Sequence, residues 1–121
     1  MTIGRNILAV IGGAIAASLV IASTEAIGHA ALEGEAMFGA AVLGYGLGAL
    51  VGTAVATLIA GRRAAVAVPV ILGGLAAFNL FSFPHPLWFA FAAVAALALG
   101  WLLGSRLGSR RSRPVLGSDG A

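Results

Sequence analysis

Four long apolar runs, separated by short polar connections, dominate the chain. The runs span about residues 7–28, 37–60, 64–81 and 87–105. A helix of about 20 apolar residues crosses the ~30 Å hydrocarbon core of a bilayer, and the usual range is about 17–25 residues. Transmembrane strands would instead alternate polar and apolar positions over about 10 residues. Because these runs are apolar on every face, the pattern predicts four transmembrane helices.

The connections between the runs read HAALEGEA, GRRA and FSFPHP. Short connections make consecutive helices antiparallel neighbours. We therefore predict an all-α membrane protein whose four transmembrane helices form an up-down-up-down antiparallel bundle in one domain, residues 1–106. The remaining segment, residues 107–121, is rich in Gly, Ser and Arg. That composition predicts a disordered, Arg-rich cytoplasmic tail.

Composition agrees with lipid as the solvent of this surface. Hydrophobic residues make up 60% of the chain and charged residues 9%, whereas a soluble domain has about 45–50% apolar and about 25% charged residues. The chain has no cysteine, which excludes disulfides and thiolate metal sites. Its basic residues stand at the ends of apolar runs and form no basic face with interleaved aromatics, so nucleic-acid binding is not predicted.

All seven basic residues are arginines, and they occur in only three of the five segments that flank the runs. They are Arg5, Arg62, Arg63, Arg106, Arg110, Arg111 and Arg113. In a four-helix topology these three segments share one side of the membrane, and arginine favours the cytoplasmic side. We therefore predict a multi-pass protein of the bacterial inner (plasma) membrane with both termini in the cytoplasm. The arginines after residue 105 are predicted to bind anionic lipids at the tail.

Small residues recur at every fourth position in two of the runs. They are Ala40, Gly44, Gly48, Gly52 and Ala56 in the second run, and Ala92, Ala96, Gly100 and Gly104 in the fourth. Small side chains let helix backbones approach closely in lipid, where no hydrophobic force drives helices together. The stripes predict helix packing within the bundle. A homo-oligomer or a membrane-protein partner is the alternative explanation.

Rare polar residues gather at the end of the bundle opposite the arginines. Glu25 and His29 have the i, i+4 spacing that places two side chains on one helix face. Asn79 closes the third run, and His85 lies in the loop that follows it. These four residues form a candidate proton or cation site. Glu25, His29 and His85 are also candidate ligands for a divalent metal, although no cofactor is predicted. The simpler alternative is that Glu25 is an interfacial acid that reaches the headgroups.

Three motifs carry a likeness to a known group of proteins. They are E-x-x-x-H in the first run, AGRR before the third, and N-x5-HP-x-W leading into the fourth. The whole chain resembles uncharacterised small four-helix bacterial inner-membrane proteins, and the likeness implies a four-helix fold with no assigned activity. The small multidrug resistance transporters also have four helices and an acid in the first. Their acid lies nearer mid-membrane, so their function is not carried over.

The function these features favour is that of a structural, accessory or partner-binding membrane subunit without catalytic activity. One alternative is a small proton- or cation-coupled transporter that uses Glu25 and His29 near the outer face. Another is a metal binder on the periplasmic face. The sequence contains no visible nucleophile–base pair, phosphate-binding loop or complete metal-ligand set, so an enzyme is not predicted.

Overall fold

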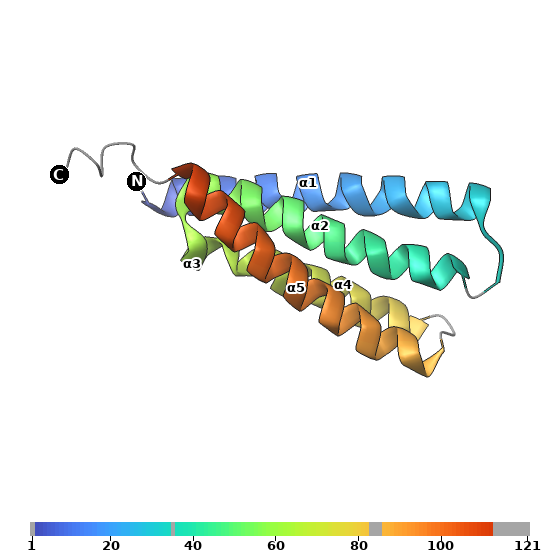
Figure 1. Ribbon diagram of the computed structural model, residues 1–121. Coiled ribbons are helices and arrows are strands. Elements are labelled where there is room, and N and C mark those ends of the chain that lie inside the picture. Colours follow the sequence, from blue (N-terminus) through green and yellow to red (C-terminus); the bar gives the residue numbers. More distant parts are fainter. Residues whose placement is uncertain (1, 35, 83–85, 113–121) are drawn as a thin grey trace.

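The computed structural model describes residues 2–34, 36–82 and 86–112, and nearly all of them are helical (Figure 1). The helices are α1 (Thr2–Ala31), α2 (Ala36–Ala60), α3 (Arg62–Ala65), α4 (Ala67–Ser82) and α5 (Leu87–Ser112). Four helical spans are long and apolar enough to cross a membrane, and α3 and α4 together form the third. The predicted all-α, four-helix membrane fold is confirmed.

The long helices alternate in direction along the bundle (Figure 1). The start of α1, the short α3 and the end of α5 therefore lie at the same end. Arg5, Arg62, Arg63, Arg106 and Arg110 belong to these segments, so the described arginines gather at one end of the bundle, which we call the arginine end. The end of α1, the start of α2, the end of α4 and the start of α5 lie at the other end.

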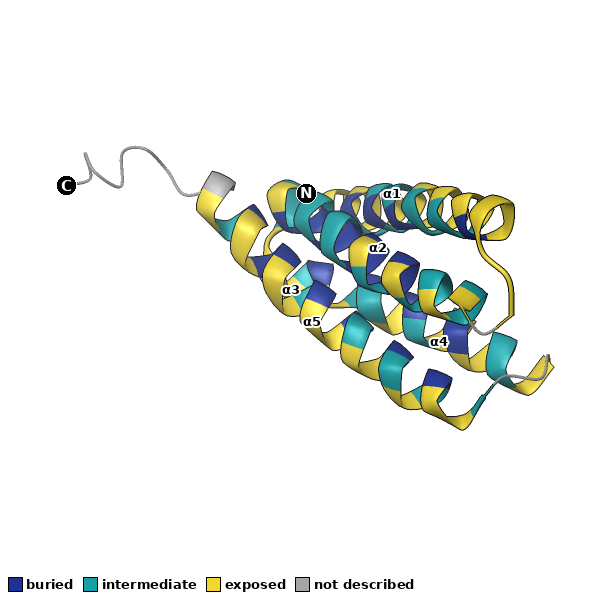
Figure 2. Cartoon of the chain, turned by 45° about the vertical axis from the view of Figure 1, so that its right-hand side comes forward, coloured by how far each residue is buried: buried dark blue, intermediate teal, exposed yellow. Residues whose placement is uncertain are grey.

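The outer surface of the bundle is exposed along all four spans (Figure 2). Large apolar side chains supply much of that surface, as Ile15, Leu43, Phe78 and Leu99 illustrate on α1, α2, α4 and α5. A soluble protein rarely exposes contiguous apolar patches of this kind. The surface is suited to contact with lipid chains, and the chain is a multi-pass membrane protein.

Two helices extend beyond their predicted limits. α1 begins at Thr2 and ends at Ala31, whereas the sequence predicts about residues 7–28. α5 continues to Ser112, so the segment predicted as a disordered tail from residue 107 is helical up to that point. Arginine and leucine favour helix in this stretch, and Gly108 packs against α2. Residues 113–121, including Arg113, lie outside the described residues.

The third span is interrupted near the arginine end, between α3 and α4. Proline has no N–H group, so Pro69 cannot donate the helical hydrogen bond to the Ala65 carbonyl. The Val66 N–H bonds to the Arg63 carbonyl at 3.3 Å. The Val70 N–H bonds to the Val66 carbonyl at 3.4 Å, which is a long hydrogen bond. The interruption lies one turn before the proline, where an interior proline disturbs a helix.

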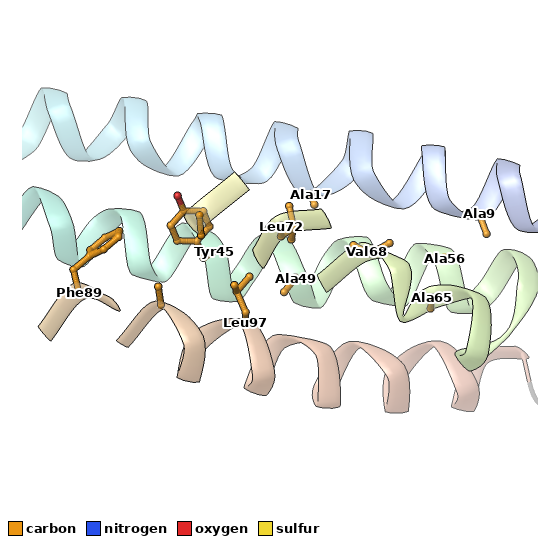
Figure 3. Packing of buried hydrophobic residues seen from close by; sticks show 12 residues of the cluster. Ala9, Ala17, Tyr45, Ala49, Ala56, Ala65, Val68, Leu72, Phe89 and Leu97 are labelled. Carbon is orange, nitrogen blue, oxygen red and sulfur yellow. The ribbon is translucent and has the colours of Figure 1, made fainter. Parts of the chain in front are cut away.

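α2 lies between α1 and α5 (Figures 1 and 3). Its glycine stripe contacts α1. A methyl group on Gly48 would lie 3.1 Å from the Ala17 carbonyl oxygen, and one on Gly52 would lie 2.6 Å from the Gly13 carbonyl oxygen. Substitution by any larger residue would therefore push the two backbones apart. Such close approach supplies dispersion contacts that a bulkier interface could not.

A second row of glycines joins α5 to another face of α2. Methyl groups on Gly100 and Gly104 would collide with the carbonyl oxygens of Gly46 and Leu50. One on Gly108 would lie 2.8 Å from the Ala54 carbonyl oxygen. The α5 stripe predicted from the sequence thus extends to a third glycine. Close backbone contact along both sides of α2 makes this helix the centre of the bundle.

The arginine end of α2 is closed by a glycine and an arginine. Gly61 has a positive φ of 90°, a conformation that side chains disfavour, and its N–H bonds to the Thr57 carbonyl at 2.9 Å. The Arg5 guanidinium reaches across from α1 and donates to the Ile59 carbonyl from Nε at 3.0 Å and from Nη2 at 2.7 Å. A positive charge at this position also stabilises the negative end of the helix dipole.

Candidate functional site

A cleft of about 220 Å³ opens between α1 and α4, and α2 forms its floor. Its lining residues are Ser18, Ile21, Ala22, Glu25, Tyr45, Leu72, Leu75, Phe78 and Asn79. Leu75 and Phe78 on its rim are exposed, so the cleft opens sideways toward the surface that faces lipid. The walls are mostly apolar, with four polar side chains among them.

Helical spacing explains why α1 contributes its share of the lining. Ser18, Ile21, Ala22 and Glu25 occupy positions i, i+3, i+4 and i+7, which form one face of a helix. Glu25 lies six residues before the end of α1 at Ala31, and that distance is about 9 Å at 1.5 Å per residue. The sequence predicted that this helix ends at about residue 28, so Glu25 lies farther from the end of its helix than the sequence indicated.

Two of the polar groups are bonded to each other across the floor of the cleft. The Asn79 Nδ2 donates a hydrogen bond to the Tyr45 hydroxyl oxygen at 3.1 Å. Tyr45 is buried on α2, and its hydroxyl is on the side of the ring that faces α1 in Figure 3. Since this oxygen accepts from Asn79, its own proton remains available to a group in the cleft.

Glu25 is half-buried in the cleft wall. In the described part of the chain its carboxylate makes no hydrogen bond or ion pair. A carboxylate without a partner in apolar surroundings is costly. It therefore needs a proton, a cation or water from outside the chain.

The remaining candidates from the sequence do not join this arrangement. His29 is exposed and lies outside the lining of the cleft, although it shares a helix face with Glu25. His85 lies outside the described residues. Among residues 2–34, 36–82 and 86–112, no group of three or more His, Asp or Glu side chains could hold a metal ion. Of the four predicted site residues, Glu25 and Asn79 are the two that line one cleft.

In comparisons with known proteins, no family model, no curated protein and no solved structure matches this chain. Function must therefore be argued from the site. A carboxylate, a phenol, an amide and an alcohol converge on an apolar space that opens toward lipid. Such a set can accept a proton, or it can coordinate a cation through its carboxylate, hydroxyl and amide oxygens.

Two polar lining residues were missing from the predicted site, Ser18 and Tyr45. The available signal for Ser18 was its i, i+7 relation to Glu25. The signal for Tyr45 was that it is the one tyrosine of the chain and stands inside an apolar run, where a phenol needs a hydrogen-bond partner. Neither signal identifies the partner, because that depends on how α2 and α4 are turned toward each other.

Proposed function

We propose that this protein binds a proton or a small cation at Glu25 within the membrane, and that it acts as a small proton- or cation-coupled transporter. One observation carries the proposal. Glu25 lines the same cleft as Tyr45 and Asn79, which come from two other helices. The sequence favoured an accessory role because the helix interiors offered few polar groups. Convergence of Ser18, Glu25, Tyr45 and Asn79 on one cleft now favours binding.

Energetics support this function. A charged side chain costs about 2.5–3.5 kcal/mol at the centre of a transmembrane helix, and acids in such segments commonly mark ion or proton pathways. Glu25 is off-centre, so its cost is smaller. Proton uptake removes the charge, and a bound cation neutralises it. Either event stabilises the cleft.

The way in which the cleft is closed also fits a carrier. Leu72, which lines the cleft, and Val68 on α4 are buried toward the arginine end, and we propose that this packing closes the cleft at that end in this conformation. The interruption between α3 and α4 provides a point about which α4 could rotate, since the Val66–Val70 hydrogen bond is long. We propose that movement of α4 about this point exposes Glu25 alternately to the two sides.

The test is a flux measurement in proteoliposomes. A potassium diffusion potential would drive proton or sodium entry, read with internal dyes for pH and for sodium. We expect flux with the wild type and loss of at least about tenfold with Glu25→Gln, because the neutral amide cannot take up a proton or balance a cation. Glu33→Gln is the matched control, since Glu33 is exposed in the connection between α1 and α2. Equal flux for wild type and Glu25→Gln would overturn the proposal.

A second candidate, an accessory or partner-binding subunit, is favoured by a feature of α4. A methyl group on Gly73 or Gly74 would meet nothing within 4 Å, while the glycines of α2 and α5 described above contact neighbouring helices. Open glycines inside a span suit the approach of a helix from another chain. This function predicts no flux in liposomes and loss of a co-purifying membrane protein when Gly74 is replaced by isoleucine.

We further propose the orientation indicated by the arginines, with the arginine end in the cytoplasm and the Glu25 end outside. In this orientation the cleft is reached from the outer half of an inner membrane.

A further inference from the structure

A second hollow lies on another side of the bundle, between α2 and α5, and has a volume of about 280 Å³. Its lining residues are Val42, Leu43, Gly46, Leu47, Leu50, Ala96, Leu99, Gly100 and Leu103. All are apolar side chains or glycines. Gly46 and Gly100 form part of its lining, at the place where the backbones of the two helices approach each other closely. We call this hollow the α2–α5 groove.

Two arginines continue the groove toward the arginine end. Leu99, Leu103, Arg106 and Arg110 stand at i, i+4, i+7 and i+11 on α5, a spacing that keeps them on one helix face. The rise from Leu99 to Arg106 is about 10 Å. Basic side chains therefore follow directly after the apolar lining on the same side of the helix.

These arginines differ from Arg5 at the same end of the bundle. Arg5 is bonded to the Ile59 carbonyl, so its guanidinium already has an acceptor. Arg106 and Arg110 are exposed, and within the described residues their guanidinium groups make no hydrogen bond or ion pair. A guanidinium has five N–H donors that match phosphate oxygens in pairs, so both side chains are available for an anion.

We propose that the α2–α5 groove binds one acyl chain of an anionic phospholipid and that Arg106 and Arg110 bind its phosphate headgroup. The groove supplies the apolar part of the site and the arginines supply the charge. The arginines and the groove follow each other along the helix axis in the order that fits a lipid in the leaflet at the arginine end. Its headgroup would lie at the level of the arginines and its chain would point toward Leu99. The site is independent of Glu25 and of the cleft between α1 and α4.

Charge complementarity decides between this occupant and its competitors. A second copy of the chain packed side by side would bring its own arginines to the same level, and like charges would repel. A free phosphate would use the arginines but leave the groove unused. A zwitterionic lipid would fill the groove but carry an opposing positive group near the arginines. An anionic phospholipid satisfies both halves of the site.

The experiment is native mass spectrometry of the full-length protein from mild detergent, titrated with phosphatidylglycerol and with phosphatidylcholine of identical chains. We expect tighter binding of phosphatidylglycerol by the wild type. Each arginine near a headgroup contributes about 1 kcal/mol, so the double variant Arg106→Gln/Arg110→Gln should lose about 10- to 30-fold in phosphatidylglycerol affinity. The control is Arg62→Gln/Arg63→Gln, which removes the same charge from α3 at the same end.

The apolar half of the site is tested separately. Leu103→Trp places a large ring in the groove and should weaken binding of both lipids, whereas Leu102→Trp, beside it on α5 but outside the groove lining, should not. Inorganic phosphate at the same concentration should fail to displace the lipid. If both arginine double variants lost the same phosphatidylglycerol affinity, the effect would depend only on the total charge at this end, and the proposed site would be overturned. Displacement by phosphate alone, or equal effects of the two tryptophan variants, would also overturn it.

Discussion

The Asn79 amide donates a hydrogen bond of 3.1 Å to the Tyr45 hydroxyl and so connects α4 to α2. The two residues are 34 positions apart in the sequence. Their bond lies on the floor of the cleft that contains Glu25. It therefore has two roles in our account, since it holds α4 against the bundle and orients the phenol proton toward the space where a ligand would bind.

The first prediction concerns the strength of this bond. Hydrogen bonds between transmembrane helices contribute about 0.6 kcal/mol on average and up to about 1.7. Tyr45→Phe should lower the free energy of unfolding by about that amount, because it removes the acceptor and leaves the Asn79 amide unpaired. Unfolding by sodium dodecyl sulfate in mixed micelles measures the change.

The double variant Tyr45→Phe/Asn79→Leu supplies the control for that measurement. If the residues interact, the loss in the double variant should be smaller than the sum of the losses in the two single variants. Simple additivity would mean that the hydrogen bond contributes nothing to stability in the membrane.

Prediction from sequence succeeded for the fold because hydropathy alone decides it. An apolar run of about 20 residues has few alternatives to a membrane-spanning helix. The residues at which the helices begin and end were harder to predict from the sequence. Nothing in the residues around Ser105 stops α5, and its continuation to Ser112 depends partly on the packing of Gly108 against Ala54 and Thr57.

The candidate site was predictable only in part, for a geometric reason. Periodicity places Glu25 and His29 on one face of a helix, but it does not say which neighbour that face meets. In the structure the face of Glu25 lines one cleft together with Asn79 of α4, while His29 lies outside the lining of that cleft. Tyr45 was not assigned to the site, because its role depends on the rotation of α2 relative to α4.

The second prediction compares the same glycine-to-alanine substitution at two positions, one closely packed and one open. Gly52→Ala places a methyl group 2.6 Å from the Gly13 carbonyl oxygen and 2.9 Å from the Ala17 Cβ. Overpacking of this kind costs about 1–3 kcal/mol, so this variant should unfold at a lower detergent concentration than the wild type.

Gly74→Ala is the matched control, since nothing lies within 4 Å of its added methyl group. Alanine favours helix over glycine by up to about 1 kcal/mol, so this variant should be as stable as the wild type or more stable. If the two alanine variants had the same stability, the close contact between α1 and α2 would be wrong.

The third prediction concerns orientation. The chain lacks cysteine, so single cysteines can be introduced without background. Glu33→Cys lies in the connection opposite the arginine end, and Ser118→Cys lies in the segment after α5. An impermeant maleimide applied to intact bacterial cells should label the first and should reach the second only after lysis. The reverse pattern would place the Glu25 cleft on the cytoplasmic side.

The most direct measurement of the central claim is labelling of the protein in membranes with dicyclohexylcarbodiimide. This apolar reagent partitions into lipid and adds to a protonated carboxyl group, and the adduct rearranges to a stable N-acylurea that peptide mass spectrometry locates. Because Glu25 lines a cleft that opens toward lipid, we predict modification at Glu25, little modification at Glu33, and protection of Glu25 by the cation that the flux assay identifies, or by raised pH if the ligand is a proton. Modification of Glu33 in preference to Glu25, or modification of Glu25 that neither the cation nor pH changes, would contradict a proton or cation site in the cleft.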